Sequence, residues 1–227
     1  MSGVAVICGM RAEAALLPRG VVCACSGGRA ARVYDEARRL LAEGALGLMS
    51  FGIAGGLDPA LAPGALAVGT AVAVDDDLLP CDSSWVEALV AALAGAHAGV
   101  IVGAADPVTY PLAKASLHRR WQALAVDLES GAVARACTEA NKPFAVLRAI
   151  ADPASRTIPP TALKGITASG RMNPFAVARG LLARPADLPG LVRLGGEARV
   201  ALEALAGAAR RLGSTLGFEA GMAIRHK

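Results

Sequence analysis

Short runs of apolar residues alternate with segments of helical periodicity over the first 152 residues. Continuous apolar runs are typical of strands that are buried on both faces of a sheet. The expected strands span residues 4–8, 21–25, 46–51, 65–74, 99–102, 123–126 and 144–150. The expected helices span residues 29–43, 84–94, 112–120, 130–140 and 188–212, with a short helix after Gly9. This alternation predicts a three-layer α/β/α sandwich around a central mixed, largely parallel sheet.

Two segments depart from this alternation. The glycine-rich stretch 52–56 is expected to break the strand that precedes it. From about residue 154 to 187, Pro, Gly, Arg and Lys with scattered apolar residues replace the periodic pattern, so we expect an irregular apolar and basic insert. The length fits one domain over residues 1–227, and the helix over 188–212 is expected to pack across the sheet.

Composition narrows the class of protein. The chain is 54% hydrophobic and only 4% aromatic, so its core must consist mainly of Ala, Val, Leu and Ile. The net charge of +4 is mild and the cations are not interleaved with aromatic residues, which argues against a nucleic-acid partner. Five cysteines without a CxxC pair predict reduced thiols in the cytoplasm and neither a disulfide framework nor a metal site.

Membrane and export signals are weak. The N-terminus lacks a basic start followed by an apolar stretch, so no secretory signal is visible. Residues 88–105 are nearly uncharged, but Gly95, Gly99 and Gly103 interrupt them. A surface helix followed by a buried strand explains this stretch better than a membrane span.

Two carboxylates stand out near the middle of the chain. Glu129 lies where a predicted helix begins, and Asp152 ends the apolar strand that follows this helix. A carboxylate between apolar walls is costly unless it is paired, hydrogen-bonded or protonated, and a protonated one can act as a general acid. Asp152 could instead cap a turn before Pro153, and Glu129 could interact with the helix dipole, a role that Asp127 fits better.

Four short patterns in order resemble the nucleoside phosphorylase superfamily, especially its methylthioadenosine/S-adenosylhomocysteine nucleosidase branch. They are Cys8–Glu13, Ser50–Leu57, Val126–Ser130 and Arg148–Asp152. The Ala-rich first part and the long insert are most similar to the hopanoid-associated phosphorylases, bacterial proteins linked to removing adenine from adenosylhopane. The resemblance implies cleavage of the N-glycosidic bond of a 5′-substituted adenosine, in a homodimer without metal or organic cofactor.

The resemblance also implies roles for single residues. Asp152 takes the position of the general acid that protonates the purine at N7, but Ala151 stands where the family often has Ser, so a neighbouring hydrogen bond is missing. Glu129 matches the glutamate that accepts hydrogen bonds from the ribose hydroxyls, a task suited to a carboxylate. Leu128 replaces the common Met and is expected to pack against the sugar.

The nucleophile is left open between water and inorganic phosphate. Glu13 matches the residue that positions the attacking water, and a carboxylate beside the ribose repels a second anion. Against this, the loop formed by Ser26, Gly28 and Arg29 could bind phosphate as a co-substrate through its backbone N–H groups. Ser26 could also be an ordinary helix cap. The residues favour hydrolysis slightly.

The sequence says least about which residues bind the base and the 5′ substituent. Gly55 permits close approach of the backbone to base and ribose. Pro107 stands where relatives carry a stacking aromatic residue, and Val108 follows it. The insert mixes cations with apolar residues, as lipid-facing loops do, although ordinary surfaces and oligomer contacts do so too. The alternatives are a methylthioadenosine/S-adenosylhomocysteine nucleosidase and a non-catalytic nucleoside sensor, which would not need to keep Asp152 and Glu13.

Overall fold

The computed structural model describes residues 3–27, 29–163 and 174–225. Eight strands form one sheet. The strands are β1 (Ala5–Cys8), β2 (Val22–Cys25), β3 (Leu48–Gly56), β4 (Leu66–Val74), β5 (Asp77–Pro80), β6 (His97–Gly103), β7 (Ala125–Asp127) and β8 (Phe144–Asp152). The helices are α1 (Arg11–Ala14), α2 (Ala30–Ala42), α3 (Ser83–Ala92), α4 (Pro111–Trp121), α5 (Ser130–Glu139), α6 (Pro160–Leu163), α7 (Pro174–Ala183), α8 (Leu188–Leu212) and α9 (Phe218–Arg225), with a 3-10 turn η1 (Pro185–Asp187).

The sheet is mixed and largely parallel, as the alternation of elements predicted. β1 pairs in parallel with β2 and β3, β3 with β8, β4 with β6, and β6 with β7. The antiparallel pairs join β3 to β7, β4 to β5 and β4 to β8. The pairings connect β3, β8, β4, β6 and β7 in a ring, so β3 has neighbours along most of its length and lies deep in the molecule.

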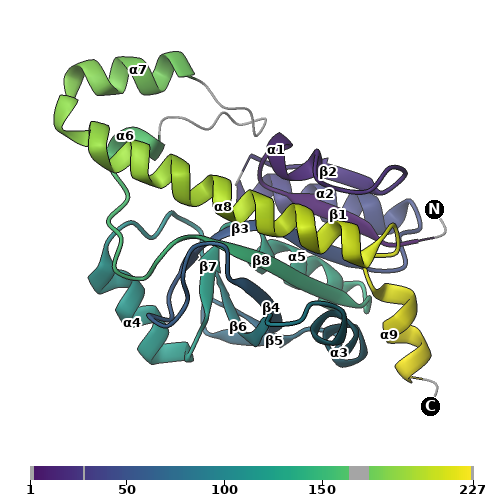
Figure 1. Ribbon diagram of the computed structural model, residues 1–227. Helices are drawn as coiled ribbons and strands as arrows, with labels where there is room; N and C mark the ends of the chain where they lie inside the picture. The colour runs from purple at the N-terminus through teal and green to yellow at the C-terminus, as the bar shows by residue number, and fades with distance from the viewer. Residues whose placement is uncertain (1–2, 28, 164–173, 226–227) are drawn as a thin grey trace.

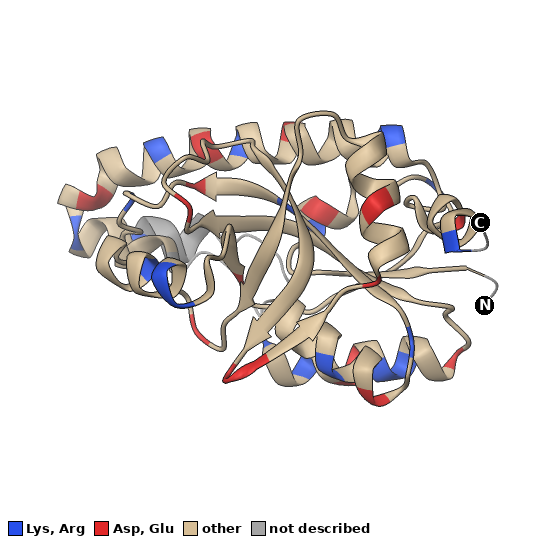
Figure 2. Cartoon of the chain, turned by 90° about the horizontal axis from the view of Figure 1, so that it is seen from below, with Lys and Arg blue, Asp and Glu red and all other residues tan. Residues whose placement is uncertain are grey.

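Helices cover both faces of this sheet (Figure 1). α2 and α5 pack against each other on one side, and α8 crosses β8 and β3 on the other. The buried residues of α8 repeat at helical spacing and form one apolar stripe: Ala201, Leu205, Ala208, Ala209 and Leu212. Lys and Arg alternate with Asp and Glu on the outer helices, whereas the strands carry little charge (Figure 2). The expected α/β sandwich and the long crossing helix are therefore confirmed.

The glycine-rich stretch does not break its strand. β3 continues through Gly56, because it pairs with β8 on one side and β7 on the other, and backbone pairing needs no side chains. The expectation that the strand ends at Phe51 was wrong. The glycines instead leave room for functional side chains from neighbouring elements, as described below.

The second half holds more helix than the pattern indicated. The segment 154–187 was expected to be irregular, but its described part contains α6, α7 and η1. Two cations of this segment, Lys164 and Arg171, lie outside the described residues. β5 and α9 were not predicted either: β5 begins with a charged residue and ends in Pro, and α9 is only 8 residues long. Within the described residues, no helix is long and apolar enough to cross a membrane.

The α9 helix is held on α3 by Trp85. The indole Nε1 of Trp85 donates to the carbonyl of Leu216 at 2.8 Å, and its ring meets the Phe218 ring edge-on with centroids 4.9 Å apart. Gly221 brings the two helices close together, because a Cβ there would lie 2.8 Å from Cα of Trp85. The close approach of two backbones decides the position of α9.

We predict that Gly221→Ala destabilises the fold by about 1–3 kcal/mol, since the added methyl group forces α9 away from α3. Gly196→Ala is the matched control: it also lies in a helix, but no atom would lie within 4 Å of its new Cβ. There the lower backbone entropy of Ala should stabilise α8 by about 0.5–1 kcal/mol. Urea unfolding measures both changes, and equal effects of the same sign would contradict this packing.

Candidate active site

A buried arginine gathers the acidic side chains of the site. Arg148 lies in the middle of β8 and is fully buried. Its Nε donates to Oδ2 of Asp127 at 2.5 Å, and its Nη2 donates to Oγ of Ser50 at 2.5 Å. The same Nη2 lies 3.5 Å from Oε2 of Glu129. Sequence reasoning quoted Arg148 only as part of a motif, although a cation inside an apolar strand is itself a signal of a buried partner.

Glu13 reaches this cluster from the short helix α1. Its Oε2 accepts from the backbone N–H of Met10 at 2.7 Å, and its Oε1 accepts from that of Ile53 at 2.8 Å. Gly52 makes this possible, because a Cβ there would lie 2.6 Å from Oε1 of Glu13 and 2.5 Å from Nη1 of Arg148. Burial raises the pKa of Glu13, while the Arg148 charge and the backbone hydrogen bonds oppose the rise.

Asp127 and Glu129 divide two tasks between them. Oδ1 of Asp127 accepts from the backbone N–H groups of Glu129 at 3.0 Å and Ser130 at 2.8 Å, so Asp127 fixes the start of α5. The Glu129 side chain makes no capping bond and lies against Gly9, where a Cβ would come within 2.5 Å of Oε1. The interpretation of Asp127 as the helix-terminal acid is confirmed. Burial raises the pKa of Glu129 to about 8, against the opposing charge of Arg148.

The cluster has more acid than base and one unused donor. A single guanidinium faces the carboxyl groups of Asp127, Glu129 and Glu13, all of which are buried. Among the described residues, Nη1 of Arg148 has no hydrogen-bond partner. A buried unpaired N–H is unfavourable, and it is satisfied when a polar molecule binds beside it. This donor and the Glu13 carboxylate both lie beside Gly52, close to the same point of β3.

Asp152 lies at the end of β8, beside Gly55. The pairing shifts register here: β3 advances from Ala54 to Gly55 while β8 advances from Ile150 to Asp152. Such a bulge turns a side chain away from the regular alternation, and Oδ2 of Asp152 comes within 3.3 Å of a Cβ built on Gly55. Sequence reasoning predicted both residues as site residues, and the structure places them in contact.

A lysine that the sequence analysis did not consider holds Asp152. Nζ of Lys114, on α4, forms an ion pair with Oδ2 of Asp152 and donates to the carbonyl of Pro153 at 3.0 Å. The Lys114 side chain is 0% exposed and that of Asp152 8% exposed. Burial raises the pKa of Asp152 to about 6, with the Lys114 charge pulling it down. The contact of Asp152 with a cation replaces the predicted alternative of a turn cap.

The remaining predicted residues differ in their burial. Leu128 is half-buried between Asp127 and Glu129, Val108 packs on the small cluster that contains Val126, and Pro107 is exposed. The loop 104–110 meets the segment after Asp152, because the Ile158 N–H donates to the Thr109 carbonyl at 2.9 Å.

The loop proposed for phosphate is mostly engaged in the sheet. The backbone N–H of Ser26 donates to Cys8 O and that of Gly27 to Gly9 O, each at 3.0 Å. The Ser26 hydroxyl also donates to Cys8 O, at 3.3 Å, and Ser26 does not cap α2, whose N-cap residue is the exposed Arg29. Gly28 lies outside the described residues. The described part of this loop therefore offers a phosphate ion little beyond Arg29.

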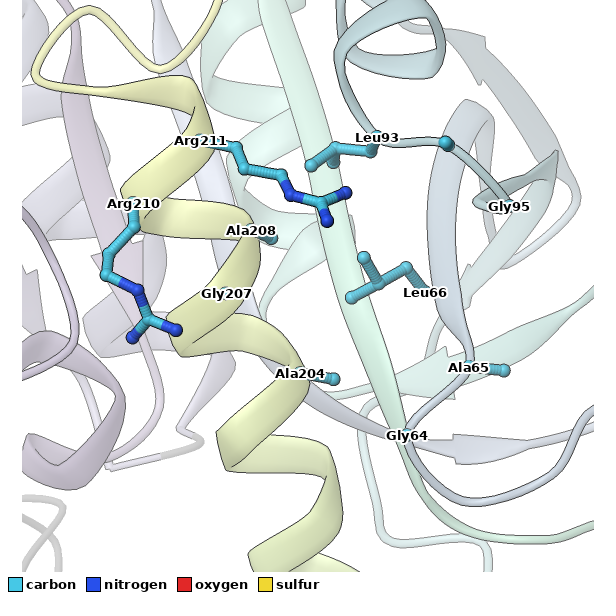
Figure 3. Close-up of a pocket in the computed structure, with 11 residues that line it drawn as sticks. Gly64, Ala65, Leu66, Leu93, Gly95, Ala204, Gly207, Ala208, Arg210 and Arg211 are labelled. Carbon is cyan, nitrogen blue, oxygen red and sulfur yellow. The ribbon is translucent and has the colours of Figure 1, made fainter.

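A separate hollow of about 500 Å³ lies between α8 and the loops before β4 and β6. Arg211 reaches across it toward Leu66 and Leu93, while Arg210 points away (Figure 3). None of the carboxylates described above lines this hollow. It therefore lacks the acid and the sugar-binding group that the chemistry requires.

The structure defines an α/β protein with a cluster of buried carboxylates at its central sheet, and comparison with known proteins gives the family. The profile of the Phosphorylase superfamily matches residues 5–183. The chain therefore belongs to the phosphorylase superfamily of enzymes. A search of curated protein sequences finds no match.

Solved structures share the fold at low sequence identity. A 5′-methylthioadenosine/S-adenosylhomocysteine nucleosidase from Neisseria meningitidis is 20% identical, with a TM-score of 0.66 over 92% of this chain and 98% of the other. An S-adenosylhomocysteine nucleosidase from Streptococcus pyogenes is 20% identical, with a TM-score of 0.62 over 68% and 86%. A futalosine hydrolase mutant from Helicobacter pylori is 19% identical, with a TM-score of 0.58 over 66% and 89%.

We predict that Arg148→Met destabilises the protein in a pH-dependent way. The raised pKa of Glu129 means that its contribution to stability is complete below pH 4.5 and is lost as the pH rises through about 8. Removing Arg148 raises the pKa values of Glu13 and Glu129 further, so the loss grows with pH. We expect about 3–5 kcal/mol at pH 8.5 and less at pH 5.5, measured by urea unfolding.

The control for this experiment is Arg135→Met. Arg135 pairs with Asp75 at 2.6 Å on the surface, where their side chains are 39% and 79% exposed. Its loss should cost at most about 1 kcal/mol, with little difference between the two pH values. An Arg148→Met deficit that is the same at both pH values would contradict the proposed charge balance.

Proposed function

We propose that this enzyme cleaves the N-glycosidic bond of a 5′-substituted adenosine and releases adenine. The observation that carries the proposal is the buried Asp152 carboxyl, whose pKa near 6 suits a proton donor at neutral pH. A departing purine needs a proton at N7, and the ribosyl cation that it leaves needs anions nearby. Asp152 would supply the proton, and the carboxyl groups around Arg148 would stabilise the cation.

Glu129 is proposed to hold the ribose. Its carboxyl group does not cap α5, and its contact with Arg148 is a 3.5 Å ion pair through Oε2, so the carboxyl group has acceptor sites for the vicinal hydroxyls of the sugar. Hydroxyl donors favour the ionised carboxylate, so substrate binding should lower the pKa of Glu129 from about 8. Leu128 beside it is proposed to pack on the sugar, and Val108 and Pro107 are proposed to border the base.

Water is the nucleophile that the charges favour. The Glu13 carboxylate can accept a hydrogen bond from water, and the free Nη1 of Arg148 can donate one to the same molecule. Phosphate would face Glu13, Glu129 and Asp127 against a single guanidinium, which is repulsive at short range. Phosphorolysis through Ser26, Gly28 and Arg29 stays the alternative.

We predict that the purified protein releases free adenine and that Asp152→Asn slows this release at least about 100-fold, because the amide has no proton to donate to N7. Chromatography of the released base measures the rate. Asp76→Asn is the matched control, since the Asp76 side chain is 90% exposed and pairs with Arg120 on the surface. An Asp152→Asn variant as fast as the native protein would remove Asp152 from its role.

The same assay with and without inorganic phosphate identifies the nucleophile. A free 5′-substituted ribose, formed at the same rate with and without phosphate, supports water as the nucleophile and the role of Glu13. A ribose 1-phosphate product would establish phosphorolysis instead. A protein that binds adenosine derivatives without cleaving them would be a sensor, and the proposed activity would be wrong.

The 5′ substituent is proposed to be the hopane tail of adenosylhopane, with methylthioadenosine or S-adenosylhomocysteine as the alternative. The chain after Asp152 leads into α6; α6, α7 and the first turns of α8 project beyond the sheet (Figure 1). Exposed apolar residues lie here beside exposed cations: Leu182 is 86%, Leu188 49% and Val192 68% exposed, and Arg179, Arg184 and Arg193 accompany them. Such a surface suits an anionic membrane that carries a lipid substrate.

We predict that replacing Leu182 and Val192 together by Asn lowers adenine release from adenosylhopane in anionic vesicles about tenfold or more, because two membrane-inserted side chains are lost. Release from soluble methylthioadenosine should not change. Leu78→Asn, at a 51% exposed position of β5, is the control. If the double variant releases adenine from adenosylhopane as fast as the native protein does, the soluble nucleosidase alternative is favoured.

We also propose a homodimer in the cytoplasm that contacts the inner face of the membrane peripherally. Tyr110 and Leu112, at the start of α4, are 60% and 85% exposed and are apolar positions that a second copy could cover. No metal or organic cofactor enters the proposed reaction. Within the described residues, no group of His, Cys, Asp and Glu is arranged to hold a metal ion.

A further inference from the structure

Lys114 is the buried cation that the proposed reaction leaves unexplained. It lies in α4, and its side chain is 0% exposed, unlike the exposed Arg119 and Arg120 of the same helix. Burying an ammonium group is costly unless an anion and further hydrogen-bond acceptors meet it. The carboxylate of Asp152 and the carbonyl of Pro153 are these partners. A buried lysine is thus paired with the carboxyl group that is proposed to donate the proton.

The residues next to Asp152 in the sequence offer its carboxyl group no side-chain hydrogen-bond donor. Ala151, which precedes Asp152, has no hydroxyl to offer. Lys114 reaches the carboxyl group from another element, α4, and the Pro153 carbonyl keeps its ammonium from swinging away. Two further charges act on Asp152: Arg156 in the loop after β8 and Glu197 on α8, which form an ion pair with each other.

We propose that Lys114 is a positioning residue for the general acid, which holds the Asp152 carboxyl at the end of β8 and makes it a stronger acid than burial alone would leave. The proposal rests on the function above, in which Asp152 protonates the purine. Glu197 and Arg156 act on the Asp152 carboxyl in opposite directions and less strongly than Lys114, so Lys114 supplies the main opposing charge.

The need for such a residue follows from the proton transfer itself. As the bond from ribose C1′ to N9 breaks, its electron pair stays on the purine, and the Asp152 proton moves to N7. The product is a carboxylate in a buried place, which is unfavourable without a cation. The Lys114 ammonium stabilises this carboxylate until water returns a proton to it. Burial raises the pKa of Asp152 and Lys114 lowers it, and the balance near 6 keeps the group close to the working pH.

The test compares the pKa of Asp152 in the native protein with that in Lys114→Met and Lys114→Arg. The carbon-13 signal of the carboxyl carbon reports this pKa during an NMR titration, and Asp152→Asn assigns the signal. Lys114→Met should raise the pKa by about 1 unit or more, because the cation is lost, whereas Lys114→Arg should nearly keep it. The pH at which kcat/KM for adenine release falls by half should rise by the same amount.

Lys142→Met is the matched control, since Lys142 is exposed and should shift neither value. Lys114→Gln, which retains a donor without the charge, takes over if the Met variant does not fold, and its pKa shift should be the same. A lower rate or stability with an unchanged Asp152 pKa would overturn the proposal and leave Lys114 a structural residue. A shifted pKa in a protein that releases no adenine would instead refute the proposed function.

Discussion

The site depends on the charge balance around Arg148. One fully buried guanidinium holds Asp127 directly, reaches Glu129 and lies beside Glu13. Without it, these carboxylates could stay buried only in their protonated form, because an isolated buried charge is strongly unfavourable. Arg148 of β8 also bonds to Ser50 of β3, and its partner Asp127 fixes the start of α5. Glu13 of α1 is held beside it by the backbone N–H groups of Met10 and Ile53.

Glycines in β3 make this arrangement sterically possible. A side chain at Gly52 would collide with Glu13 and Arg148, and one at Gly55 would press on Asp152. Pairing with β8 from Leu48 to Gly55, and with β7 at Gly55 and Gly56, keeps the backbone in place without side chains. Acidic groups from two elements, Glu13 of α1 and Asp152 of β8, can therefore approach β3 closely. The proposed proton donor differs from the other acids in its partner, since Asp152 faces Lys114 and not Arg148.

Local sequence patterns predicted most of the strands and helices of this protein. Apolar runs and helical periodicity predicted the alternation of strands and helices, and α8 was predicted with its observed bounds. Asp127, Glu129 and Asp152 were recognised because acids at the ends of apolar segments are unusual. Pattern reasoning failed where pairing partners decide the structure: β3 continues through glycines, and α9 is placed by Trp85 and Gly221.

By itself, the sequence determined the fold class, the apolar character of the core and the acids that carry the proposed chemistry, because these depend on residue type and on spacing within one element. Only the tertiary structure decided the partners of those acids. Arg148 and Lys114 read as a cation inside a strand and a cation on a helix, and their roles arise from contacts with residues 21 and 38 positions away. Charge compensation in a buried site is a property of distance in space, which sequence spacing does not encode.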